Sequence, residues 1–314
     1  MAQDQDTNHS RFGVFGDVPT RVMNWTIATF PRMPFIVEAS VLHFFTLIVF
    51  LLAHQQRRSI RANLKVIYED LSWAEGYVGA FMVLRNFGWS YVDSIRARQG
   101  QKVITWDVEG EEVFEKVRGA QGAAMLFTTH TGNYDLAGAL FADRFERTLY
   151  TVRVPERSEH LQKIRKEQLT SDMQNHEHFK VLYNDDSKLL GVELARLLSE
   201  GELLAIQCDR VIGDVVKLDV PFGDGGVFFR VPKGPLTLAC FAKCPCYPLF
   251  VVRDRFRHYR VIFEPALEPC PEPGQRRLSE MDYAKPWVAR LRAFLQQYGW
   301  EWFVLEDAFT YPDE

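Results

Sequence analysis

The sequence predicts an α/β fold in which helices flank a mixed, largely parallel sheet on both faces, preceded by an N-terminal membrane-associated helix. Three observations support this expectation. Short apolar runs with strand character alternate with amphipathic stretches of helical periodicity, an alternation typical of parallel strands covered by helices. The 314 residues are 47% hydrophobic, which allows a large core. A long apolar run also lies near the N-terminus.

The N-terminal region divides into a loose tail, residues 1–20, and a membrane-associated helical segment, residues 21–65. Residues 35–53 are apolar except for Glu38, Ser40, His43 and Thr46. A spanning helix requires ~20 mostly apolar residues, so this run predicts an anchor. Whether the anchor spans the bilayer or lies in its interface stays open. Thirty or so mixed residues precede the run, unlike a signal peptide, so we expect the N-terminus to be kept.

A basic cluster follows the apolar run directly, at residues 55–65. Arginines and lysines in this position favour contact with an anionic cytoplasmic leaflet. The alternative is an ordinary solvated helix face. Because the cluster adjoins the most apolar segment of the chain, we expect a membrane surface to be one partner.

The rest of the chain, residues 66–314, is expected to form one α/β domain. The predicted strands are residues 103–108, 123–127, 147–152, 179–183, 203–207, 246–252 and 259–263. The predicted helices are residues 73–95, 111–118, 134–140, 159–169, 188–199, 236–242 and 283–298. The Gly-rich residues 223–226 predict a flexible turn, because they lack the spacing of a nucleotide-binding loop.

Composition excludes several classes of function. A net charge of −4 argues against a nucleic-acid partner. Five cysteines, an odd number without a disulfide pattern, fit a reduced compartment. Cys240, Cys244 and Cys246 are close in sequence, but no Cys-x2-Cys pair or nearby histidine completes a zinc site, so we expect no metal.

His130 and Asp135 form the most informative motif in the sequence. The predicted strand 123–127 ends just before His130, and the predicted helix 134–140 follows. Functional residues of α/β folds lie at such strand ends. If the turn brings Asp135 under the ring, its carboxylate holds one imidazole nitrogen and leaves the other as a base that deprotonates an alcohol. The alternative is a structural histidine beside an aspartate at a helix start.

Four segments together carry a family resemblance: residues 57–64, 130–135, 201–210 and 234–239. With them, the chain from about residue 21 to residue 305 resembles the bacterial lipid A biosynthesis (lauroyl/myristoyl) acyltransferases of the lysophospholipid acyltransferase superfamily. The resemblance implies an enzyme at the cytoplasmic face of the bacterial inner membrane. It would move a fatty acyl chain from an acyl carrier protein or coenzyme A thioester to a lipid or glycolipid hydroxyl. The thioester is a cosubstrate, and no further cofactor is expected.

Two departures leave the acceptor open. Lipid A enzymes often carry glutamate where this chain has Asp135. Glycerolipid acyltransferases carry aspartate there, but they add a Phe-Pro-Glu-Gly-Thr-type motif that this sequence lacks.

The expected mechanism assigns the proton transfer to His130, with Asp135 fixing the tautomer. The oxyanion of the tetrahedral intermediate needs donors. Gly132 and Asn133 offer backbone N–H groups at a helix start for this purpose.

Three further residues are candidates for the site. Arg153 follows a predicted strand, and the resemblance places a functional arginine at Arg165; either side chain would stabilise the oxyanion, or else be a solvated cation. Asp209 matches the aspartate turn of the family and would orient an arginine or the acceptor. Its alternative is a loop aspartate that caps a turn.

Rival functions remain. A thioesterase or lipid hydrolase would use the same dyad on water, although the chain has no Gly-x-Ser-x-Gly nucleophile elbow. A non-catalytic membrane-associated protein would tolerate the loss of either dyad residue. A metal-dependent phosphatase would need more clustered histidines and aspartates than the sequence offers.

Overall fold

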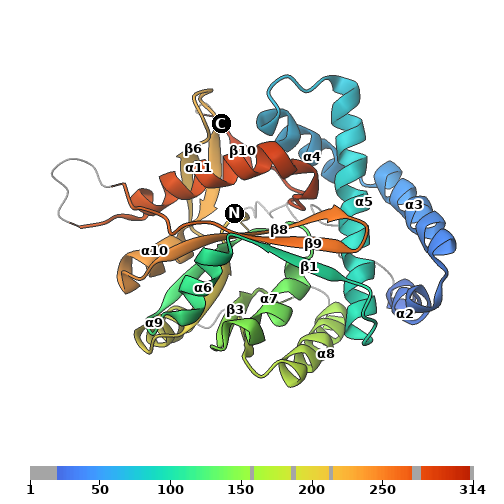
Figure 1. Cartoon of the computed structure of the whole chain (residues 1–314). Helices are drawn as coiled ribbons and strands as arrows, with labels where there is room; N and C mark the ends of the chain where they lie inside the picture. Colours follow the sequence, from blue (N-terminus) through green and yellow to red (C-terminus); the bar gives the residue numbers. More distant parts are fainter. Residues whose placement is uncertain (1–19, 156–158, 185–188, 212–214, 271–276, 312–314) are drawn as a thin grey trace, which may run out of the picture.

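A seven-stranded mixed sheet forms the centre of the fold (Figure 1). The computed structural model describes residues 20–155, 159–184, 189–211, 215–270 and 277–311, so the predicted tail, residues 1–20, lies almost wholly outside them. The strands, in spatial order, are β1 (Thr105–Glu109), β9 (His258–Phe263), β8 (Cys246–Arg255), β2 (Ala124–Thr128), β5 (Leu203–Gln207), β3 (Leu149–Arg153) and β4 (Phe179–Tyr183).

Most neighbouring strands of this sheet run parallel. The run from β8 through β2, β5, β3 and β4 is parallel, whereas β9 pairs antiparallel with β8. β1 then pairs parallel with β9. All seven strands occur where the sequence predicted them, and the expectation of a mixed, largely parallel sheet is confirmed.

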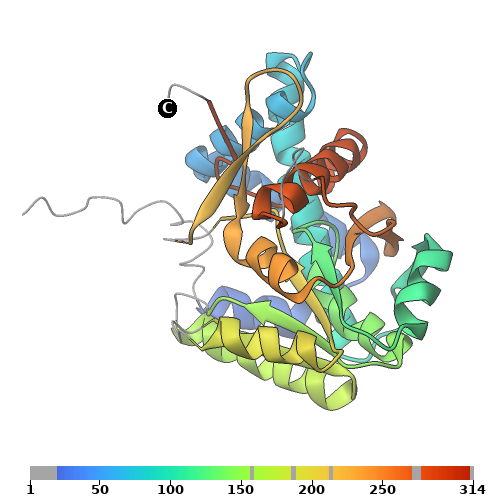
Figure 2. The same ribbon diagram turned by 90° about the vertical axis from the view of Figure 1, so that its left-hand side faces the viewer.

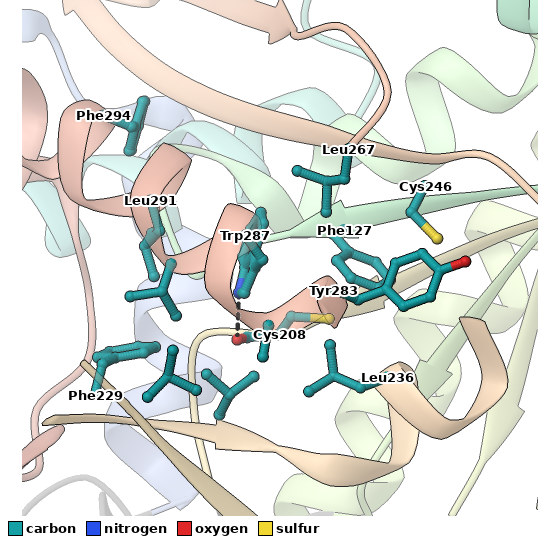
Figure 3. Close-up of a cluster of buried hydrophobic side chains, with 14 of the residues drawn as sticks. Phe127, Cys208, Phe229, Leu236, Cys246, Leu267, Tyr283, Trp287, Leu291 and Phe294 are labelled. Atoms are coloured by element: carbon teal, nitrogen blue, oxygen red, sulfur yellow. Dashed lines mark hydrogen bonds between the residues drawn. The ribbon is translucent and has the colours of Figure 1, made fainter. Parts of the chain in front are cut away.

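Helices pack on both faces of the sheet. One face carries α6 (Glu111–Gly119), α7 (Tyr134–Ala142) and α8 (Glu159–Asn175); the other carries α9 (Leu190–Ser199), α10 (Lys233–Ala242) and α11 (Glu280–Tyr298). Alternate residues of β2 serve the two cores: Met125 and Phe127 face α11, and Leu126 faces α7. In Figure 3, Phe127 lies against Trp287 of α11, their ring centroids 5.6 Å apart.

A small antiparallel sheet stands beside the main one. It consists of β6 (Lys217–Pro221), β7 (Phe228–Pro232) and β10 (Phe309–Thr310), in the order β10-β7-β6 (Figure 2). The predicted turn at residues 223–226 is the hairpin turn between β6 and β7, closed by a 2.8 Å bond from Phe222 N–H to Val227 O. The sequence analysis did not predict these three strands: β10 has only two residues, β6 is mostly exposed, and both β6 and β7 end in a proline.

The N-terminal helices lie on one side of the molecule, along the long helix α5 (Trp73–Arg98) (Figure 1). α2 (Thr20–Thr29) and the 3-10 turn η1 (Phe30–Arg32) lead into α3 (Phe35–Leu52), which is long and apolar enough to cross a membrane. Only three residues of α3 are buried: Glu38, Leu42 and Thr46, spaced four apart on one face.

Buried ion pairs hold α3 against the domain. Glu38 is fully buried and accepts hydrogen bonds from Arg96 at 2.7 Å and Arg257 at 2.5 Å. Arg96 also donates to the carbonyls of Phe30, Pro31 and Met33, which fixes the turn before α3. A glycine at position 88 allows close contact, because a Cβ there would lie 2.8 Å from the Leu42 side chain.

The basic cluster forms helix α4 (His54–Ile67). Arg57 and Arg61 do not project freely: their guanidinium groups lie over aromatic rings, Arg61 at 3.7 Å from the Tyr77 centroid and Arg57 at 5.0 Å from the Phe50 centroid. Arg58 is exposed and lines a cavity beside the candidate site. The cluster is therefore divided between packing and an open polar surface.

Candidate active site

The ends of two neighbouring parallel strands bring His130 and Asp209 together. β2 and β5 are paired in register from Ala124 opposite Leu203 to Thr128 opposite Gln207. His130 stands two residues beyond the end of β2, and Asp209 stands two residues beyond the end of β5. The same register therefore carries the two residues to opposite positions, at the carboxyl edge where α/β folds place functional groups.

Asp209 holds the imidazole of His130 in one orientation. Its Oδ1 lies 2.8 Å from His130 Nδ1, and its Oδ2 accepts the backbone N–H of His130 at 2.7 Å and Trp302 Nε1–H at 2.9 Å. Burial would raise the pKa of Asp209, but the contacts with His130 and Trp302 outweigh burial and lower it. The ionised carboxylate can only accept, so Nδ1 carries the hydrogen.

The opposite ring nitrogen, Nε2, is the one left for chemistry. Within the described ranges of the chain, no side chain or carbonyl bonds it. The His130 side chain keeps 10% of its surface exposed, and the Tyr134 ring packs edge-on against it at 5.1 Å. The imidazole is therefore held at Nδ1, while Nε2 makes no hydrogen bond to any described residue.

Neighbouring contacts fix both strand ends. Trp287 of α11 donates its indole N–H to Cys208 O at 3.0 Å, directly before Asp209 (Figure 3). Cys208 N–H bonds Thr128 O at 3.0 Å, and Phe303 N–H bonds His130 O at 2.8 Å. The pair rests on rigid backbone, which is what precise positioning of a base requires.

Asp135 does not contact His130, so the predicted His130–Asp135 pairing is corrected. Its carboxylate instead binds three arginines: Arg98 at 2.8 Å, Arg165 at 2.8 Å and Arg153. The prediction was wrong because the carboxylate, at the start of α7, lies towards the cations of α5, β3 and α8. Asp209, predicted to orient an arginine or the acceptor, occupies the place assigned to Asp135.

Asp135 and its arginines form a partly buried ionic cluster. Arg98 also makes a two-pronged contact with Asp172, with distances of 2.9–3.2 Å. Burial alone would raise the pKa of Asp135, but Arg153, Arg165 and Arg98 outweigh it and hold the pKa well below its ordinary value. The cluster joins α5, α7, α8 and β3 beneath the site. Sequence reasoning missed Arg98 and Asp172, which lie 37 residues from Asp135 on either side.

The two predicted backbone donors differ in what they offer. Gly132 N–H is occupied by Glu301 O at 3.2 Å, so Gly132 is not a free oxyanion donor and that expectation is corrected. Glycine is required there because φ is +53° and because a Cβ would lie 2.6 Å from Val251 O. The Asn133 side chain bonds Ser90 O and Ser94, which leaves its backbone N–H at the start of α7.

Three cavities include Asp209 or residues that neighbour His130 in the sequence. A large one, of about 620 Å³, includes Asp209 in its wall. A narrow apolar one, of about 60 Å³, runs between the sheet and α7 and includes Thr129. A third, also about 60 Å³, includes Asn133, Tyr134 and Arg165. Arg153 lines the apolar cavity, so both candidate arginines lie at the site although both are paired with Asp135.

Among the described residues, the candidate site is built without a cluster of metal ligands. In the part of the chain that the structure describes, no three His, Cys, Asp or Glu side chains are placed to hold a metal ion.

No curated protein matches the chain. The sequence profile of the bacterial lipid A biosynthesis acyltransferases matches residues 18–285. This match covers most of the chain, so the protein belongs to the bacterial lipid A biosynthesis acyltransferase family, whose members transfer acyl groups.

Proposed function

We propose that this protein is a membrane-associated O-acyltransferase in which His130 is the general base and Asp209 orients it. The donor is an acyl carrier protein or coenzyme A thioester, and the acceptor is a hydroxyl of a lipid or glycolipid at the cytoplasmic face of the inner membrane. The observation that carries this proposal is the contact of His130 Nδ1 with the buried Asp209 carboxylate, which leaves Nε2 as the base.

The reaction follows from this geometry. Nε2 takes the acceptor hydroxyl proton as the oxygen attacks the thioester carbonyl, and Asp209 stabilises the resulting imidazolium. The tetrahedral intermediate then expels the thiolate, which recovers the proton from His130. For the oxyanion, we propose the Asn133 N–H at the start of α7, supported by the positive field of Arg153 and Arg165.

The apolar cavity supports binding of the acyl chain. Side chains of β2, β3, β5 and α7 line it, among them Leu126, Ala137, Phe141 and Ala205, and Thr129 places it beside His130. Its volume of about 60 Å³ is too small for a long chain, so binding requires α7 to move from the sheet. Each buried CH₂ group contributes roughly 0.8 kcal/mol, which favours this opening.

The outer face of α3 supports membrane contact. Seven large hydrophobic side chains of this helix are exposed: Phe35, Ile36, Val37, Phe44, Leu47, Leu51 and Leu52. An exposed apolar surface of this extent marks an interaction site. Glu38 on the opposite face is held by Arg96 and Arg257, so we propose that α3 lies in the bilayer interface against the domain and does not span the bilayer.

Replacement of His130 tests the function. We expect His130→Ala to lower the rate of acyl transfer from a palmitoyl thioester to lipid by at least roughly 10⁴-fold, to a residual rate measured by mass spectrometry of the lipid product. The matched control is His176→Ala, which removes a partly exposed histidine paired with Asp143. Full transfer by His130→Ala would refute the mechanism, and release of free fatty acid without an acylated lipid in wild type would indicate a hydrolase.

A further inference from the structure

More cationic than anionic side chains line the large cavity beside Asp209. Arg58 of α4, Lys217 of β6 and Arg230 of β7 converge on it from three separate elements, together with Arg210. Two of its acidic residues already have partners: Asp209 contacts His130 and Trp302, and Glu306 pairs with Arg210. Asp307 remains, exposed at the rim.

Three of these cations lack an anionic partner among the described residues. Across those parts of the chain, no carboxylate pairs with Arg58, Lys217 or Arg230. Arg230 Nε is buried and makes no hydrogen bond to any described residue. Converging cations with a desolvated and unused donor favour an anionic ligand, because a buried donor left unpaired costs free energy.

Hydrogen bonds between separate elements fix the wall of this cavity. Asn63 of α4 donates to Glu306 O at 2.8 Å and accepts the N–H of Ala308 at 3.1 Å, which fixes the segment that forms one side. Arg230 N–H bonds Ala308 O at 3.1 Å and joins β7 to the same segment. A volume of about 620 Å³ lies within the range of small-ligand sites.

We infer that this cavity binds the phosphate-bearing part of one substrate. The inference rests on the proposed function: because Asp209 both lines the cavity and holds His130, a group bound there lies next to the base. Phosphate is the shared chemistry, and it has two sources, the phosphates of the thioester donor or a phosphate on the lipid acceptor. Arg58, Lys217 and Arg230 are the residues that recognise it.

Calorimetric binding of inorganic pyrophosphate to the full-length protein tests this inference. Arg58 and Lys217 are exposed, so Arg58→Gln/Lys217→Gln should fold normally, and thermal unfolding checks this. We expect the double variant to weaken pyrophosphate binding by at least about tenfold, and increasing salt to weaken wild-type binding similarly. Arg58→Lys/Lys217→Arg should restore most of the affinity. The matched control is Lys116→Gln, an exposed cation on α6.

Two further probes identify the source of the phosphate. A tenfold loss of coenzyme A binding in the double variant assigns the cavity to the donor, and the same loss for dihexanoyl phosphatidic acid assigns it to the acceptor. Unchanged pyrophosphate affinity in the folded double variant would overturn the inference. His130→Ala should bind pyrophosphate as wild type does, so failure of the proposed catalysis is distinguishable from failure of this site.

Discussion

Two aspartates near His130, one buried and one partly buried, have different partners, and these partners decide their roles. Asp209 contacts the imidazole and an indole N–H, whereas Asp135 contacts three guanidinium groups. A carboxylate that accepts from Nδ1 controls the histidine tautomer. A carboxylate surrounded by arginines instead compensates buried positive charge. We therefore expect loss of Asp209 to affect catalysis and loss of Asp135 to affect stability first.

Asp135→Asn tests the structural half of this distinction. Removing the charge leaves Arg98, Arg153 and Arg165 close together with too few anions, so the free energy of unfolding should fall by about 3–5 kcal/mol. Denaturant unfolding measures it. Asp143→Asn is the control, because its pair with His176 is 41% exposed on the aspartate side and should change stability by less than about 1 kcal/mol.

The stability difference between wild type and Asp135→Asn has a defined pH dependence. The pKa of Asp135 is lower in the folded protein than in the unfolded chain, so its contribution is fully present above about pH 3.9 and is lost as the pH falls through the folded-state value. The difference should therefore shrink in acid. A difference that is equally large at pH 7 and pH 2 would contradict the assignment.

Helix α3 combines an inner face held by ion pairs with an apolar, exposed outer face. The clamp is Glu38 with Arg96 and Arg257, and Gly88 of α5 allows the close approach. This arrangement explains how a helix with only three buried residues stays against the domain. The outer side chains are left exposed for the membrane contact that we propose.

Replacement of outer α3 residues tests membrane contact. Ile36→Ser/Phe44→Ser/Leu51→Ser should reduce binding to phosphatidylglycerol-containing vesicles by about a hundredfold, since each side chain is worth roughly 1.5–3 kcal/mol when fully buried and less in the interface. Co-sedimentation measures it. Leu189→Ser/Val192→Ser, at similarly exposed apolar positions at the start of α9, should bind as wild type does. Wild-type sedimentation of the triple variant would exclude α3 as the contact surface.

The secondary structure was largely predictable because hydrophobic periodicity reports burial directly. All main-sheet strands carry continuous or alternating apolar runs, such as residues 124–128. β6 and β7 are harder to predict, because β6 is mostly exposed and both short runs end in a proline, which is unfavourable inside a strand. The pairing of His130 with Asp209 depends on β2 lying next to β5, and strand order is a long-range property that residue spacing alone does not report.

The fold forms a cationic cavity that includes Asp209 and an apolar cavity that includes Thr129, the residue before His130. An acyltransferase needs these two environments, one for a fatty chain and one for polar substrate groups. The sheet separates them: the apolar cavity lies between the sheet and α7, and the cationic one lies by α4 and the β6–β7 hairpin.

Ala205→Leu tests the apolar cavity as the acyl site. Ala205 lies in the middle of β5 and lines this cavity, so the added methyl groups should shorten it. Turnover with palmitoyl donors should fall at least about tenfold relative to octanoyl donors, because several CH₂ groups lose their burial. The octanoyl rate serves as the internal control. Equal losses for both chain lengths would place the acyl chain elsewhere.

A double-mutant cycle on the rate of acyl transfer tests the central claim, that Asp209 acts through His130. Asp209→Asn, with its folding verified by circular dichroism, should lower kcat by roughly 10³- to 10⁴-fold, as for an aspartate that fixes a catalytic tautomer. His130→Ala/Asp209→Asn should then be no slower than His130→Ala alone, because the two residues act as one unit. Independent losses that multiply in the double variant would contradict the account.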